Sequence, residues 1–120
     1  MMNLLNAAAL LAASLQPTAV DGGPPQSSPE SAAMLRCSAA FALVSYGQAN
    51  GDEAVRAWPK IDPRAREFFV RSLAKIIDDT GMTREQVSQM AEAEAQRLID
   101  NNLLNSVMPG CLLMLDASGV

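Results

Sequence analysis

The sequence contains no histidine, only two cysteines and few aromatic residues. Without histidine the chain lacks the usual general base, the commonest zinc ligand and the ligand of most haem sites. Aromatic residues make up 4% of the chain, too few for the stacking surfaces that single-strand nucleic-acid binders use. These absences exclude histidine-dependent catalysis and metal binding through histidine.

Positive charge is also scarce, since the formal net charge is −4 and no charged side chain precedes Asp21. A negatively charged chain is a poor partner for nucleic acid, and we expect none. The sequence shows no glycine-rich phosphate loop, no paired-carboxylate site and no nucleophile motif. We therefore predict no catalytic residues, no metal site and no cofactor, and we do not expect an enzyme.

The sequence also lacks a long apolar run, and the most extended apolar stretch is Leu4 to Leu15. That length suits the apolar part of a secretory signal, whereas a spanning helix needs about 20 residues. Residues 1–19 are accordingly predicted to be a signal peptide, and the protein to be exported, in the periplasm. No Lys or Arg precedes the apolar run, so an amphipathic first helix of a cytosolic protein is the alternative.

Residues 20–30 are rich in proline, glycine and serine and are predicted to form a linker. The helical domain is then expected over residues 31–118. Roughly ninety residues can form one apolar core, but with so thin a margin that a covalent cross-link would matter.

Capping signals and apolar spacing predict helices throughout this domain. Ser28-Pro29-Glu30 is typical of a helix start, with the helix reaching about Gln48. Residues 53–58 suit a short helical segment. A helix is predicted from Pro63, capped by Asp62, to Thr80, with Gly81 closing it. The expected inward faces of these two main helices are Met34, Cys37, Phe41 and Val44, and then Phe69, Leu73, Ile76 and Thr80. The second face is flanked by Phe68, Ser72 and Ile77.

Two further helices follow. Thr83-Arg84-Glu85-Gln86 matches a capping box, which predicts a helix reaching about Asp100. Pro109 is expected to open a last short helix through about Asp116, which is apolar all round and should be buried against the first helix. The fold class is therefore all-α, a small antiparallel bundle of four to five helices. The methionines after Met2 are expected to fill its core, and Trp58 to pack at a helix break.

Cys37 and Cys111 both fall on apolar helical faces, and in an exported protein they are more simply paired than free. The loop of about 75 residues that such a disulfide closes corresponds to roughly 4 to 5 kcal/mol of stabilisation in the chain-entropy model. The alternative is two buried free thiols. A catalytic dithiol is disfavoured because redox motifs place their cysteines close together.

Basic residues gather between residues 56 and 75, and acidic ones between residues 78 and 100. Solvated helix faces with some pairing between the two helices explain this pattern. The functional alternative is a stripe that meets an anionic partner, either another envelope protein or an anionic lipid surface. The residues of this basic stripe are Lys60, Arg64, Arg71 and Lys75.

The segments LRCSAAFALVSYGQ, WPKIDPRAREFF and MPGCLLMLDAS are similar to small uncharacterised exported helical proteins of α-proteobacteria with two cysteines. This resemblance covers residues 32–118 and implies no activity. The chain also resembles the acid-stress periplasmic chaperones in its size, its helical character and its two cysteines.

The function expected from these observations is a small periplasmic interaction module, structural or chaperone-like, without catalytic activity. The alternative is a binder of a small ligand or lipid with an apolar pocket between the helices. An interaction module predicts a contiguous exposed apolar patch around Phe68, Trp58 or the C-terminal segment, whereas a ligand binder predicts an enclosed apolar pocket.

Overall fold

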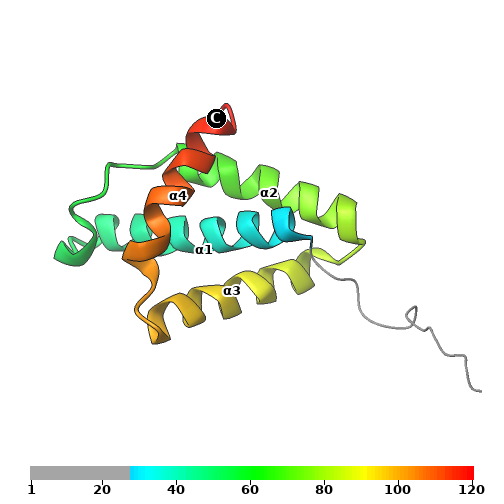
Figure 1. Ribbon diagram of the computed structural model, residues 1–120, viewed down its shortest axis with the longest axis horizontal. Helices are drawn as coiled ribbons and strands as arrows, with labels where there is room; N and C mark the ends of the chain where they lie inside the picture. The colour runs from blue at the N-terminus through cyan, green and yellow to red at the C-terminus, as the bar shows by residue number, and fades with distance from the viewer. Residues whose placement is uncertain (1–27) are drawn as a thin grey trace, which may run out of the picture.

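Helix α1, Pro29–Ala49, runs through the middle of the molecule in the computed structural model, which describes residues 28–120 (Figure 1). Ser28 caps the helix, since its hydroxyl accepts a hydrogen bond of 3.0 Å from the Ser31 N–H, and Pro29 occupies the first turn. The start predicted at this cap is therefore confirmed. The predicted signal peptide, and the linker as far as residue 27, lie outside the described residues.

The inward face predicted for α1 is also confirmed. Met34, Cys37, Phe41 and Val44 are all at most 9% exposed, and Ala40 beside them is fully buried. After α1 the chain turns at Gly51, whose φ of 72° favours glycine, and forms the short 3-10 helix η2, Glu53–Val55. The short helical segment expected over residues 53–58 is thus confined to its first three residues.

Helix α2, Arg64–Thr80, ends as predicted at Gly81, whose N–H donates to the Ile77 carbonyl at 2.9 Å. Its start differs from the prediction, because Pro63 itself occupies the capping position and no side chain caps the helix. The buried face of α2 is also rotated by about one residue from the predicted face. The buried residues of α2 are Ala65, Phe68, Ser72 and Ile76, whereas Phe69 and Leu73 are only partly buried.

Packing against α1 explains the orientation of α2. The Phe68 ring meets the Phe41 ring of α1 edge to face, with centroids 5.3 Å apart and planes at 80°. Aromatic pairs favour this arrangement over face-to-face stacking. Phe68 therefore occupies the centre of the α1–α2 contact, where the spacing in the sequence had favoured Phe69.

Helix α3, Arg84–Asp100, has the predicted capping box in full. The Thr83 hydroxyl accepts from the Gln86 N–H at 3.1 Å, and the Gln86 side chain accepts from the Thr83 N–H at 2.9 Å. Met82 before the cap and Val87 after it are both buried, as expected for the hydrophobic contact that often accompanies such a box.

Helix α4, Leu104–Ala117, begins five residues before the predicted start at Pro109. Pro109 lies in the second turn, where its missing N–H removes only the hydrogen bond to the carbonyl of exposed Asn105, which water can satisfy. The helix is also not buried all round. Met108, Cys111 and Leu115 form its buried face, whereas Leu113 is 71% exposed.

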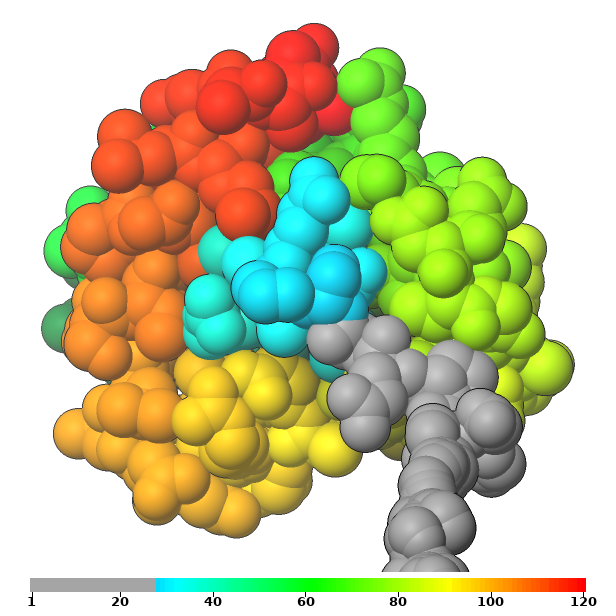
Figure 2. Space-filling view, turned by 45° about the vertical axis from the view of Figure 1, so that its right-hand side comes forward, coloured from blue at the N-terminus to red at the C-terminus, as the bar shows by residue number. Residues whose placement is uncertain are grey.

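Figure 1 shows α1 between α2 and α3, with α4 crossing this layer. In the space-filling view the N-terminal end of α1 is surrounded by the other three α-helices (Figure 2). Cys37 and Cys111 form a disulfide that joins α1 to α4, with Cα atoms 5.2 Å apart. Across residues 28–120 the elements are four α-helices and one 3-10 helix, so the predicted all-α bundle with one long-range disulfide is confirmed.

Methionines fill the core as predicted: Met34, Met82 and Met108 are buried, and Met90 and Met114 pack against the core. The Trp58 ring is partly buried beside the end of η2, and its indole N–H donates to the Asn105 Oδ1 at 2.9 Å. Between residues 28 and 120 no helix is both long and apolar enough to cross a membrane.

Candidate functional site

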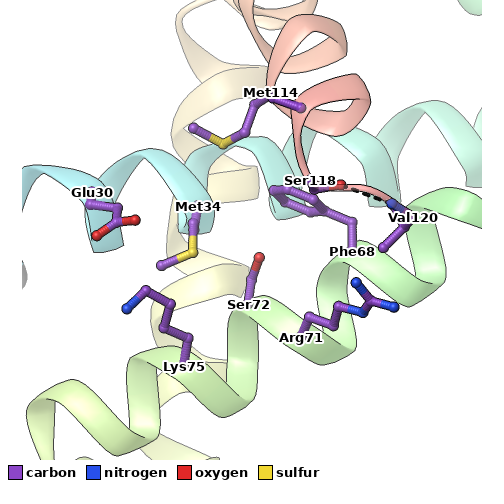
Figure 3. Close-up of a pocket in the computed structure, with 10 residues that line it drawn as sticks. Glu30, Met34, Phe68, Arg71, Ser72, Lys75, Met114, Ser118 and Val120 are labelled. Atoms are coloured by element: carbon purple, nitrogen blue, oxygen red, sulfur yellow. Dashed lines mark hydrogen bonds between the residues drawn. The ribbon is translucent and has the colours of Figure 1, made fainter.

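A pocket of about 340 Å³ lies where α1, α2 and the end of α4 meet (Figure 3). Its mouth is open to solvent, so it differs from the enclosed cavity that the sequence suggested for a ligand binder. Side chains from all three helices and the C-terminal turn line it. They are Glu30, Met34, Phe68, Arg71, Ser72, Lys75, Met114, Ala117, Ser118 and Val120.

The disulfide positions the two methionines of this pocket. Met34 lies three residues before Cys37 on α1, and Met114 lies three residues after Cys111 on α4. Three residues are nearly one helical turn, so each methionine lies on the same side of its helix as the adjacent cysteine. The bond between the cysteines therefore joins the two helix segments that carry these methionines, and both methionines lie across the pocket from α2 (Figure 3).

Two hydrogen bonds hold the C-terminal turn beside the pocket. The Arg64 Nε donates to a backbone oxygen of Val120 at 3.0 Å. The Val120 N–H donates to the Ser118 hydroxyl at 3.4 Å (Figure 3). Arg64 also pairs with Asp116 of α4 at 2.8 Å. Both partners of this pair are largely exposed, so its contribution to stability is under about 1 kcal/mol. Its main effect is to position the turn.

Arg71 and Lys75 form the charged side of the pocket. The Arg71 Nε lies 3.2 Å from a Glu67 carboxylate oxygen, and the Lys75 Nζ lies 2.9 Å from an Asp79 carboxylate oxygen. The hydrogen bond and charge of Asp79, with smaller effects of Glu30 and Asp78, raise the pKa of Lys75 above its ordinary value. The Lys75 ammonium therefore keeps its charge at neutral pH.

Ser72 is the polar residue of the pocket that is most deeply buried, with 4% of its surface exposed. Its hydroxyl points into the pocket, and it forms no hydrogen bond with any of the other residues that line it (Figure 3). Sequence reasoning placed Ser72 only beside the apolar face of α2. The signal that could have singled it out is a polar residue four positions after Phe68 and four before Ile76, both of which are buried.

The four residues of the predicted basic stripe do not form one surface in the structure. Arg71 and Lys75 line the pocket together, and Arg64 secures the C-terminal turn. Lys60 precedes α2 and so lies off the helical stripe. It lines a different hollow of about 260 Å³ near Trp58 and Gln48.

The charge pairing expected between the second and third main helices is wrong. Every ion pair within residues 28–120 either stays within one local segment or, in the case of Arg64 and Asp116, joins α2 to α4. Helix α1 lies between α2 and α3 (Figure 1), which keeps most of the two helices apart.

The exposed apolar patch expected for an interaction module does not form at Phe68, which is buried. The large apolar side chains that are exposed lie one on each α-helix of the described segment, namely Tyr46, Val70, Ile99 and Leu113. The same segment contains no group of three or more cysteine or acidic side chains that could hold a metal ion.

Comparisons with models of protein families, with curated proteins and with solved structures find no match to this chain.

Proposed function

We propose that this protein is a non-catalytic binding module that holds a small, largely apolar ligand in the pocket between α1, α2 and α4. The observation that carries the proposal is a pocket of about 340 Å³ with methionine and phenylalanine side chains on its walls. Ligand pockets commonly occupy about 300 to 1,000 Å³ and combine apolar walls with a few polar groups. This pocket lies at the small end of that range.

The chemistry of the walls supports this proposal. Met34 and Met114 are flexible and polarisable, so they can adapt to ligands of different shape. Phe68 supplies a rigid surface between them, held by its edge-to-face contact with Phe41. An apolar group entering the pocket would exchange contact with water for contact with these three side chains, which is favourable.

An interaction module, structural or chaperone-like, is less well supported. Such a module would offer a partner a contiguous apolar surface, whereas the exposed apolar side chains are distributed over four helices. We also propose that the protein acts outside the cytoplasm, in the periplasm. A structural disulfide is compatible with an oxidising compartment, and the apolar segment at residues 4–15 suits export.

Binding can be tested with the neutral fluorescent probe N-phenyl-1-naphthylamine, titrated into the full chain and displaced with decanol. We expect saturable binding that the Met114→Trp variant abolishes, because the larger indole fills the pocket. Leu113→Trp is the matched control, since Leu113 is its neighbour on α4 but is 71% exposed. Equal loss of binding in both variants, or no saturable binding by the parent protein, would exclude the proposed function. Circular dichroism establishes that both variants fold.

A further inference from the structure

We infer that the ligand is a single-chain amphiphilic monoanion, whose acidic head lies against Arg71, Ser72 and Lys75 and whose chain lies against Met34, Phe68 and Met114. This inference rests on the proposed function and specifies the class of ligand. The nearest chemical example is a carboxylate with a medium-length alkyl chain.

The two cations have donors to spare. Arg71 and Lys75 are four residues apart on α2 and therefore project from the same side of the helix. Arg71 contacts Glu67 through its Nε, so its two terminal nitrogens are available to a ligand. Lys75 uses one of its three N–H donors on Asp79. Their charged ends point in opposite directions along α2, toward Glu67 and toward Asp79, with Ser72 between them (Figure 3), so an acidic head at Ser72 could accept hydrogen bonds from the free donors of either cation.

Ser72 gives an independent indication of a polar head at the same place. It lies between Arg71 and Lys75 in sequence, is 4% exposed, and points its hydroxyl into the pocket (Figure 3). A ligand oxygen at this point could accept a hydrogen bond from that hydroxyl. A purely apolar ligand would instead cover the hydroxyl and offer it no partner, which is unfavourable.

Glu30 favours a head with one negative charge. It lines the pocket from the N-terminal turn of α1 and faces the Lys75 side of the mouth (Figure 3). Arg71 and Lys75 are already paired with Glu67 and Asp79, and Glu30 adds a further negative charge, so a dianionic head would meet more repulsion than a head with one charge. The pocket volume of about 340 Å³ suits one chain better than the two chains of a phospholipid.

The test compares decanoate with decanol as competitors for the bound neutral probe on the full chain. We expect decanoate to displace the probe at a concentration at least about tenfold lower, which corresponds to one charge-assisted hydrogen bond. A purely apolar pocket would give the reverse order, because decanol is the more hydrophobic of the two. Displacement by decanol with no preference for decanoate would overturn the inference and leave the proposed function standing. Failure to bind the probe or decanol would instead remove the proposed function.

Substitutions test whether Arg71, Ser72 and Lys75 cause the preference for decanoate over decanol. The double variant Arg71→Gln, Lys75→Gln should weaken decanoate about tenfold or more and leave decanol unchanged. Ser72→Ala should weaken decanoate several-fold. Arg66→Gln is the matched control, since Arg66 is an exposed cation on the same helix that does not line this pocket. An equal effect of Arg66→Gln would show a general charge effect and overturn the inference. Binding to anionic phospholipid vesicles without binding of monomeric decanoate would also overturn the inference, because the recognised ligand would then be a membrane surface.

Discussion

Cys37 and Cys111 link the central helix α1 to α4 inside the core, with each residue at most 3% exposed and their Cα atoms 5.2 Å apart. The same bond joins the helix segments that carry Met34 and Met114, two residues that line the pocket, since each lies three residues from its cysteine. The cross-link that stabilises the domain therefore also sets the shape of the proposed binding site.

Removing the disulfide with Cys37→Ala and Cys111→Ala should lower the free energy of unfolding by about 4 to 5 kcal/mol, the chain-entropy value for a loop of this length. Urea unfolding measures the change, and the parent protein in reducing agent should approach the same midpoint. Mass spectrometry of the non-reduced parent should give a mass two hydrogens below that of the reduced chain. Two thiols that react with an alkylating agent in the native parent would contradict the pairing.

Gly47 and Gly110 should respond in opposite ways to replacement by alanine. A Cβ at Gly47 would lie 2.7 Å from the Val55 Cγ2, so Gly47→Ala should destabilise the protein by about 1 to 3 kcal/mol. A Cβ at Gly110 would meet no atom of a neighbouring element within 4 Å, so Gly110→Ala in helix α4 should stabilise it by about 0.5 to 1 kcal/mol. Thermal or urea unfolding distinguishes the two. Adding Val55→Ala should relieve the clash at Gly47, and no such rescue would refute the steric explanation.

Thr83→Ala should destabilise the protein by about 1 kcal/mol, because the Thr83 hydroxyl accepts a hydrogen bond from the first turn of α3. Gln89→Ala is the control, since Gln89 is exposed in the interior of the same helix, where alanine is the better helix former. Denaturant unfolding should show a loss for Thr83→Ala and no loss for Gln89→Ala. Equal stability of the two variants would mean that the cap contributes nothing.

Above neutral pH, decanoate binding should change only in the alkaline range. Asp79, Glu30 and Asp78 raise the pKa of Lys75 above the ordinary lysine value of about 10.4, so its charge persists through neutral pH. Affinity should be flat from about pH 7 to 9 and fall as the pH rises through the raised pKa. The ion pair between Lys75 and Asp79 depends on pH in the same direction. Its contribution to stability is present below the pKa that Lys75 has in the unfolded chain, and it is lost as the pH rises through the raised pKa of the folded protein.

Lys75→Arg is the control for this pH dependence, because arginine keeps its charge to about pH 12. The alkaline fall in decanoate affinity should largely disappear in that variant. A fall of the same size in both proteins would assign the titration to another group.

Much of the fold could be predicted because it depends on local chemistry. The Ser28 cap, the capping box at Thr83 and the closing glycine Gly81 are each satisfied by atoms within a few residues. The predictions made from Pro63 and Pro109 were less accurate. Proline is compatible with a helix start, but it does not require one, and α4 accepts Pro109 in its second turn.

The candidate site was only partly predictable. The basic stripe identified Arg71 and Lys75, yet it also included Lys60, which precedes α2, and Arg64, which holds the C-terminal turn. Ser72 was harder to single out, because a serine beside an apolar helical face is common. Its importance depends on the approach of α1 and α4, which the spacing of residues in α2 does not specify.

The sequence by itself determined the all-α class, most of the helix ends and the buried face of α1, which follow from capping and periodicity. It favoured a disulfide between Cys37 and Cys111 without excluding free thiols. Only the tertiary structure decided that α1 lies between α2 and α3, which separates the charges expected to pair (Figure 1). The tertiary structure likewise placed Met34, Ser72 and Met114 around one pocket (Figure 3). Periodicity specifies which face of a helix is buried, but which helix covers that face depends on how all the side chains pack together.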